Sequence, residues 1–155
     1  MAAIRLKTKV KIGARAECPS HSRSNVTARD TSIIIDEPPE RGGTNAGPAP
    51  TETALAALAG CTNVISHKCA NKLGIHISNV TIDVTADFDR RGVTLQEEID
   101  VPFEKIQLRV ELDTDANQED IERLAAEVGK FCPLSKLFSE AGTEISEEWV
   151  VRQPA

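Results

Sequence analysis

The stretch that decides the fold spans residues 42–73 and reads GGTNAGPAPTETALAALAGCTNVISHKCANKL. Residues 40–50 contain three Gly and two Pro, a composition typical of a loop. The longest helix is predicted to follow, with Thr51 as a cap-type residue, Glu52 as an acid in its first turn and Gly74 as its C-terminal cap. The first two thirds of this helix carry almost no charge, so we expect most of its circumference to be buried.

Strands are predicted on both sides of this helix from the alternation of apolar and polar residues. Residues 4–12 (IRLKTKVKI) alternate cleanly and predict a half-buried strand with a basic solvent face. A short strand is expected at residues 25–29, and a β-branched run at residues 32–36 stops before Pro38-Pro39. After the helix, two more strands are expected at 80–88 and 103–112.

The C-terminal third is predicted to hold two helices and a final strand. Asn117 opens one helix, whose apolar stripe consists of Ile121, Leu124, Ala125 and Val128. A short helix begins at Cys132-Pro133, since Pro is favoured at the first helical position. A last strand covers residues 144–151. This order indicates one α+β domain over residues 1–155, with mostly antiparallel strand pairing.

Composition and charge exclude several classes of function. The chain has 155 residues, a net charge of −6 and only 3% aromatic residues, which disfavours nucleic acid or an anionic membrane as the main partner. No apolar run approaches the roughly 18 residues that span a bilayer. The N-terminus lacks the apolar core of a signal peptide, so we expect a cytoplasmic protein. Cysteines in that compartment are usually reduced, and a structural disulfide is not expected.

Four cysteines are therefore the residues to explain. The helical Cys61 is either a small buried apolar residue or a reactive thiol. At a helix start, Cys132 either replaces Ser as a cap or is held as a thiolate by backbone N–H groups and the helix dipole. Both Cys18 and Cys69 are expected to be bystanders. None of the four forms a C-x-x-C pair, so a zinc site is not indicated.

Other candidate groups give weaker signals. Cys61 lies nine residues after Glu52, about two and a half helical turns, and Glu52 by itself is explained by a helix-start acid. His67 points about 240° away from Cys61 on the same helix, so a Cys–His catalytic pair within the helix is not supported. The Gly-rich loop lacks the spacing of a phosphate-binding loop.

One family shares these motifs. Residues 42–62 (GGTNAGPAPTETALAALAGCT), followed far downstream by Cys132-Pro133-Leu134-Ser135, resemble the OsmC/Ohr family of osmotically inducible and organic hydroperoxide resistance proteins. The likeness covers nearly the whole chain, because the expected elements fall in the family's order. It implies an OsmC-like fold, with antiparallel sheets around a long buried helix, in an intertwined homodimer with active sites at the interface.

The resemblance also implies a chemistry. Members of this family are thiol-dependent peroxidases that prefer organic hydroperoxides and use a dithiol reductant, of lipoyl type or a small thiol, with no metal or flavin. On this pattern Cys61 is the peroxidatic thiolate and Cys132 the resolving thiol, while Glu52 pairs with an arginine beside the reactive sulfur. Arg23 matches that arginine by spacing, and Arg29 and Arg41 are the alternatives.

Three functional hypotheses follow. The first is the peroxidase, in which a sulfenic acid at Cys61 condenses with Cys132 and in which Leu55 and Leu58 line a pocket for an alkyl or lipid hydroperoxide. The second is a non-catalytic dimeric module of the same fold that binds an apolar small ligand. The third, a cysteine hydrolase or acyl carrier, requires a histidine within about 3 Å of Cys61.

Overall fold

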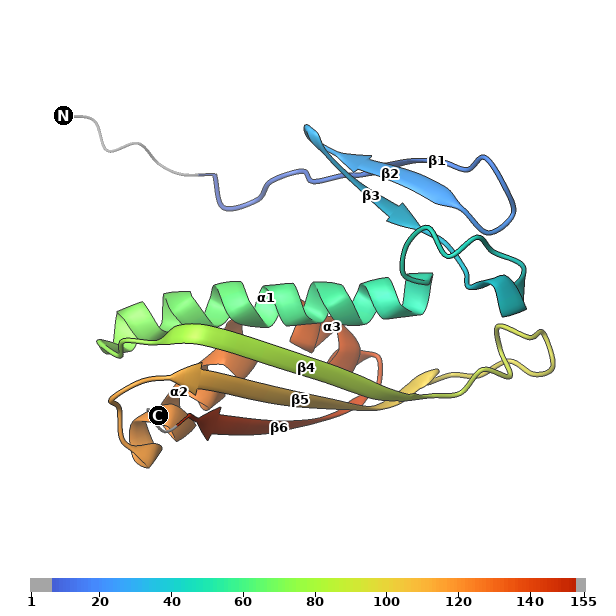
Figure 1. Ribbon diagram of the computed structural model, residues 1–155. Coiled ribbons are helices and arrows are strands. Elements are labelled where there is room, and N and C mark those ends of the chain that lie inside the picture. The colour runs from blue at the N-terminus through green and yellow to red at the C-terminus, as the bar shows by residue number, and fades with distance from the viewer. Residues whose placement is uncertain (1–6, 153–155) are drawn as a thin grey trace. The chain divides into compact units, whose positions relative to one another are not determined.

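The computed structural model describes residues 7–152, and the chain divides into two compact units at Thr53/Ala54, within the first turn of a long helix (Figure 1). The first unit contains β1 (Arg15–Glu17), β2 (Ser24–Ala28), β3 (Thr31–Ile35) and the short 3₁₀ helix η1 (Pro39–Arg41). The second contains nearly all of α1 (Pro50–Leu73), then β4 (Ser78–Phe88), β5 (Phe103–Asp113), α2 (Gln118–Phe131), α3 (Pro133–Glu140) and β6 (Glu144–Val151).

The first unit is built on an antiparallel sheet in the order β1-β2-β3. The strands predicted at 25–29 and 32–36 are confirmed, as β2 and β3. The strand predicted at 4–12 is wrong over residues 7–12, which pair with no described strand and leave Val10 and Ile12 75% and 90% exposed; residues 4–6 lie outside the described residues. Alternation indicates a strand only where a sheet edge is available to pair with it, and the chain here enters a strand only at Arg15.

Helix α1 ends as its sequence indicates but begins earlier than predicted. It runs from Pro50 to Leu73, so Thr51 lies in the first turn and the prediction that it caps the helix is wrong. Gly74 follows with a φ of +71°, the left-handed conformation typical of a residue that ends a helix. The helix buries one stripe rather than most of its circumference. The buried residues are Leu58, Thr62, Ser66, Cys69 and Ala70. Small or apolar residues stay exposed on other sides, namely Ala56, Ala57, Gly60 and Val64.

The second unit is organised by the sheet β4-β5-β6, with β5 at its centre. On β5 every second residue is buried, which gives the sheet one apolar face; these residues are Ile106, Leu108, Val110 and Leu112. The pair β4–β5 is antiparallel as expected, but β5–β6 is parallel. A parallel pair requires a long crossover, and here α2 and α3 supply it between the two strands.

The helices of this unit pack on the apolar face of the sheet. Ile121, Leu124 and Val128 of α2 are buried, which confirms the predicted stripe, and they join the core with Leu58 of α1. At the far end of the sheet, Phe103 contacts Phe138 of α3 edge to face, with ring centroids 5.3 Å apart. This contact helps hold α3, and therefore the residue that begins it, against the sheet. No helix of residues 7–152 is long and apolar enough to cross a membrane.

Candidate functional site

Helix α1 and the junction between α2 and α3 bring the thiols of Cys61 and Cys132 together. Cys61 lies near the middle of α1, where it is half-buried and packs against the core. Cys132 occupies the junction between α2 and α3, where the Val128 carbonyl accepts its backbone N–H, and it is only 1% exposed. The Cys132 Sγ lies 3.4 Å from the Cys61 Sγ. This separation is contact between two free thiols, since a disulfide bond is about 2.05 Å long.

The local backbone fixes the position of the Cys132 sulfur. Cys132 is the N-cap of α3, and its Sγ accepts a hydrogen bond from the Ser135 N–H at 3.5 Å. The following Pro133 has no N–H to leave unpaired in the first turn, so the predicted cap arrangement is confirmed. Because Cys132 caps α3, its sulfur is held at the start of that helix, where it contacts Cys61 of α1.

Burial and hydrogen bonding act on the pKa of the Cys132 thiol. Burial raises the pKa of the Cys132 thiol, the Ser135 N–H opposes that rise, and the neighbouring Cys61 thiol adds to it. Of the two alternatives for Cys132, the structure supports the cap in place of Ser, because the Cys132 Sγ accepts the Ser135 N–H and burial outweighs the helix N-terminus in the pKa of the thiol. Cys132 is a buried thiol in contact with a more accessible one.

The other two cysteines lie in different surroundings. Cys18 is exposed in the first unit, where its Sγ lies 3.4 Å from the Ser24 Oγ. Cys69 is buried in α1, and burial, followed by the charge of Glu127, raises the pKa of its thiol. Neither takes part in a sulfur–sulfur contact among the described residues.

Glu52 has a structural task at the start of α1. Its Oε2 accepts the backbone N–H of Ala49, the residue before the helix, at 2.8 Å. A carboxylate in the first turn that reaches back to the N-cap N–H is half of a capping box, and it also complements the positive end of the helix dipole. The Glu52 side chain therefore stabilises the start of the helix that carries Cys61.

The three candidate arginines differ in their partners. Arg23 donates from Nε to the Asn25 Oδ1 at 3.0 Å, and Arg29, in the turn after β2, lies 3.9 Å from its neighbour Asp30. Arg41 donates from Nε to Glu37 at 2.6 Å. That hydrogen bond raises the pKa of Arg41, and the negative charge of Glu52 contributes to the rise. Glu52 therefore acts electrostatically on Arg41.

The histidines supply no partner for Cys61 in the described part of the chain. His67 contacts the Asn63 carbonyl through Nδ1 at 3.0 Å, one turn back along α1. The imidazole of His21 lies where a side chain on Gly42 would meet it, in the first unit. No hydrogen bond within residues 7–152 joins a histidine to Cys61, so the geometry that a cysteine hydrolase needs is not present there.

Asp36 is the buried charge that sequence reasoning missed. Its carboxylate is fully buried and accepts the N–H groups of Glu37 at 2.8 Å and of Thr44 and Ala46 at 3.1 Å each. The Thr44 hydroxyl donates as well, and this bond is the largest cause that holds the pKa of Asp36 well below its usual range. The sequence signal that could have identified Asp36 is its place between a β-branched run and a Gly-rich loop. Its carboxylate binds backbone N–H groups of that loop, which precedes α1.

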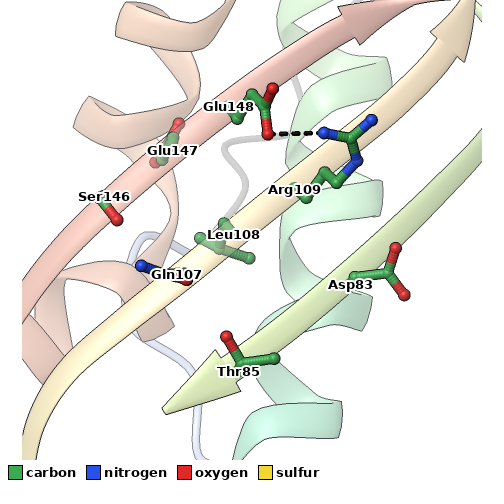
Figure 2. A pocket seen from close by; sticks show the side chains of 8 residues that line it. All are labelled: Asp83, Thr85, Gln107, Leu108, Arg109, Ser146, Glu147 and Glu148. Carbon is green, nitrogen blue, oxygen red and sulfur yellow. Dashed lines mark hydrogen bonds and ion pairs between the residues drawn. The ribbon is translucent and has the colours of Figure 1, made fainter. Parts of the chain in front are cut away.

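A hollow lies on the outer face of the β4-β5-β6 sheet (Figure 2). Figure 2 shows Arg109 of β5 between Asp83 of β4 and Glu148 of β6, and Arg109 donates to Glu148 at 2.6 Å. The neighbouring row consists of the neutral side chains Thr85, Gln107 and Ser146. The lining contains no thiol, and its arginine, Arg109, is paired with Glu148 across strands, so this hollow carries no evident chemistry.

One of the two leucines expected to line a pocket is sealed in the core. Leu58 is fully buried and unavailable to an alkyl substrate, so that part of the prediction is wrong, whereas Leu55 is only partly buried against the core. Among residues 7–152, no cluster of His, Cys, Asp and Glu is arranged to hold a metal ion.

Comparison with known proteins agrees with the fold. Residues 43–148 match the family model described as OsmC-like protein. Among solved structures, an OsmC-like protein from Mycoplasma pneumoniae matches with a TM-score of 0.74 and 19% identity, over 92% of this chain and 99% of that one. Comparison with curated proteins finds no match.

Two further structures carry names that state a function for those proteins. The organic hydroperoxide resistance protein OsmC from Legionella pneumophila matches with a TM-score of 0.67 and 19% identity, over 94% of this chain and all of that one. An organic hydroperoxide resistance protein from Elizabethkingia anophelis matches with a TM-score of 0.69 and 15% identity, over 95% and 100%. The family model covers most of the chain and the solved structures share its fold, so this chain belongs to the OsmC-like protein family.

Proposed function

We propose that this chain is a thiol-dependent peroxidase that reduces organic hydroperoxides, with Cys61 as the peroxidatic residue and Cys132 as the resolving residue. The observation that carries the proposal is the 3.4 Å contact between the two sulfurs. Membership of the OsmC-like family and the names of the Legionella and Elizabethkingia structures support the same chemistry. The reducing cytoplasm is the compartment in which such a transient disulfide works.

The difference in exposure between the two thiols supports an order of steps. Half-buried Cys61 meets the substrate, and its thiolate attacks the terminal peroxide oxygen; the O–O bond breaks, leaving a sulfenic acid and an alkoxide that takes a proton to become the alcohol. Buried Cys132 then attacks the sulfenic sulfur, and hydroxide leaves as water with the Cys132 proton. A dithiol reductant, of lipoyl type or a small thiol, returns both cysteines to thiols.

On the family pattern, an arginine next to Cys61 lowers the pKa of that thiol and stabilises charge on the peroxide, and Glu52 holds the arginine. Arg23 is our first candidate for this role, with Arg29 and Arg41 beside it. Replacing each arginine with Ala, one at a time, identifies the residue. The correct variant loses most of its turnover of hydroperoxide, while the other two retain it.

The cysteine variants test the proposal directly. Cys61→Ser is expected to abolish reduction of cumene hydroperoxide in the presence of a dithiol donor, and peroxide-treated wild type is expected to carry a Cys61–Cys132 disulfide. Cys132→Ser is expected to accumulate a sulfenic acid on Cys61 that dimedone traps. Cys18→Ser and Cys69→Ser are the matched controls and retain turnover. Full activity in Cys61→Ser would refute the proposal.

A homodimer belongs to the same proposal. The exposed side of α1 presents small and apolar residues, and β3 exposes Ile33 and Ile34, and exposed apolar surface is typical of an interface. A second copy of the chain that covers these surfaces would bury them. The alternative function, a dimeric module that binds an apolar ligand without catalysis, predicts instead that Cys61→Ser behaves as wild type in every assay.

A further inference from the structure

The loop between β4 and β5, residues 89–102, is held together by ion pairs across it. Arg91 bridges its two sides, with nitrogen–oxygen distances of 2.7 Å to Asp89 and 2.8 Å to Glu97. The backbone also turns back on itself, because the Gln96 N–H donates to the Arg91 carbonyl at 2.9 Å. The loop therefore presents its tip in a defined shape.

Two apolar side chains stand out from this tip. Leu95 is 92% exposed and Val93 is 65% exposed. The φ of Leu95 is +58°, a left-handed backbone that is unfavourable for leucine and common for glycine or asparagine. A small polar residue would suit both the backbone and the solvent better, so the leucine points to a partner that covers it.

A groove with a complementary lining lies between α1 and the end of α2, and its volume is about 360 Å³. The apolar wall consists of Ile65, Cys69 and Phe131, and two lysines, Lys68 and Lys72, complete the lining. Phe131 is 52% exposed although it is a large apolar side chain. The groove therefore offers an uncovered apolar surface with cations along it.

The loop and the groove carry opposite charges. Residues 96–100 (QEEID), which follow Leu95, contain three acids and no cation. Among the described residues, neither Glu98 nor Asp100 takes part in an ion pair, and no ion pair within residues 7–152 includes Lys68. Each surface thus has a charge that its own chain leaves uncompensated, and opposite charges of this kind fix the register of an interface.

The loop cannot fill the groove of its own chain. Strand β4 begins at Ser78, shortly after α1 ends at Leu73, and its eleven residues carry the chain about 35 Å along the sheet before the loop begins. Figure 1 shows the loop at one end of β4 and the C-terminal end of α1 at the other. Both halves of the contact are present on one chain, but they can meet only between two copies.

We propose that the groove between α1 and α2 receives the β4–β5 loop of a second copy of this chain, with Leu95 on the apolar wall and Glu98 against Lys68. The inference rests on the homodimer proposed above and names a contact that builds it. In a two-fold dimer the contact occurs twice, once in each direction, so the assembly is closed. Gly60, Val64 and Lys68 follow one another at intervals of four residues, so the groove borders the open side of α1.

Sedimentation equilibrium measures the dimer Kd and tests the role of Leu95. Leu95→Asn suits the left-handed backbone, so the variant is expected to keep the circular dichroism spectrum of the folded protein. Its Kd is expected to rise about a hundredfold, or about tenfold for each of the two contacts that lose a buried leucine. A Leu95→Asn protein that dimerises as tightly as wild type would overturn the proposal.

Charge reversal tests the pairing of Glu98 with Lys68. Glu98→Lys and Lys68→Glu each bring like charges together, and each is expected to raise the Kd about tenfold. The two substitutions in one chain restore opposite charges and are expected to bring the Kd to within about threefold of wild type. Lys105→Glu, on the outer face of the sheet, is the matched control and is expected to leave the Kd unchanged. A double variant that associates no better than the single variants would disprove the pairing.

A disulfide locates the contact even in a dimer that is too tight to dissociate. In a chain with both Leu95→Cys and Lys68→Cys, mild oxidation is expected to link position 95 of one copy to position 68 of the other, since a disulfide requires Cα atoms within about 7 Å. Non-reducing electrophoresis then shows a species of twice the 16.8 kDa mass of the chain, and peptide mass spectrometry identifies the linked pair. A chain with Lys105→Cys and Lys68→Cys is the control and is expected to form no such link.

The outcomes separate this inference from the proposals on which it rests. A dimer without the 95–68 disulfide overturns the loop-in-groove contact and leaves the homodimer standing. A wild-type mass of one chain overturns both. Reduction of cumene hydroperoxide reports on the peroxidase proposal alone, because neither Leu95 nor Lys68 belongs to the thiol pair.

Discussion

At the scale of the residue, the contact between Cys61 and Cys132 joins the partly accessible sulfur of Cys61 to the buried sulfur of Cys132. Cys132 is 1% exposed and burial raises the pKa of its thiol, whereas Cys61 is half-buried. Because alkylation requires an accessible thiolate, the order of modification is expected to follow exposure. Iodoacetamide at pH 8 is expected to label Cys18 and Cys61 well before Cys132 and Cys69.

Peptide mass spectrometry over time measures that order. Cys132 labelled as fast as Cys61 would contradict the difference in environment described above. In Cys61→Ser the neighbouring thiol is gone, and with it one of the influences that raise the pKa of Cys132, but burial remains the largest. Labelling of Cys132 is therefore expected to stay slow in that variant.

The buried carboxylate of Asp36 accepts several hydrogen bonds from the surrounding chain. Three backbone N–H groups and the Thr44 hydroxyl donate to its carboxylate. Asp36→Asn replaces one acceptor oxygen with an NH₂ donor that faces other donors, so the variant is expected to melt several degrees below wild type. Asp30→Asn, in the exposed turn before β3, is the control and is expected to melt as wild type does.

The pH dependence of that difference has a defined sign. The pKa of Asp36 in the folded chain lies below its unfolded value of about 3.9, so its contribution is fully present above that pH. It is lost as the pH falls below about 4 toward the folded pKa. Urea unfolding is expected to show a constant gap between wild type and Asp36→Asn from pH 7 to about 4, and a narrowing gap below it. If the difference in unfolding free energy between wild type and Asp36→Asn closed near neutral pH, a titratable group other than Asp36 would account for the pH dependence.

At the scale of the element, the loop before α1 depends on close backbone approaches. A Cβ on Gly47 would lie 2.0 Å from the Ile34 carbonyl oxygen, whereas a Cβ on Gly13 would meet nothing within 4 Å. Gly47→Ala therefore requires β3 or the loop to move, and it is expected to cost about 1–3 kcal/mol, the scale of overpacking. Thermal unfolding of Gly47→Ala and Gly13→Ala measures this, and equal melting temperatures would refute it.

Elements are predictable where local chemistry decides them. Asn117 caps α2, Cys132-Pro133 starts α3, Gly74 ends α1, and alternation marks β4 and β5. What the sequence does not reveal depends on distant partners. Residues 7–12 alternate but pair with no described strand, and the parallel partner of β5 is set by the crossover of α2 and α3.

The candidate site follows the same division. The cap at Cys132 is a local pattern, and by itself it leaves both a Ser-like cap and a thiolate possible. Burial by the surrounding core raises the pKa of the Cys132 thiol, and burial is not visible in a local pattern. The helix-start role of Glu52 is local and is confirmed, while the carboxylate of Asp36 gains its role from a loop that closes eight to ten residues later.

At the scale of the whole molecule, the exposed side of α1 is a surface that the fold of one chain leaves uncovered. A Cβ added at Gly60 would meet nothing within 4 Å, and Val64, one turn later, is exposed. Glycine in the middle of a helix costs about 0.5–1 kcal/mol relative to alanine, so its presence here favours a close neighbour over helix stability. A helix or sheet of a second copy is the neighbour that the proposed homodimer supplies.

Light scattering with size-exclusion chromatography tests the dimer. At micromolar concentration, wild type is expected to have twice the 16.8 kDa mass of the chain. Gly60→Arg and Val64→Glu add charge to the exposed side of α1 and are expected to shift the mass toward one chain, because an unpaired charge buried in an interface is costly. Thr85→Arg, on the outer face of the sheet, is the control and is expected to remain a dimer. A wild-type mass of 16.8 kDa would refute the shared interface, and the open side of α1 would then need another partner.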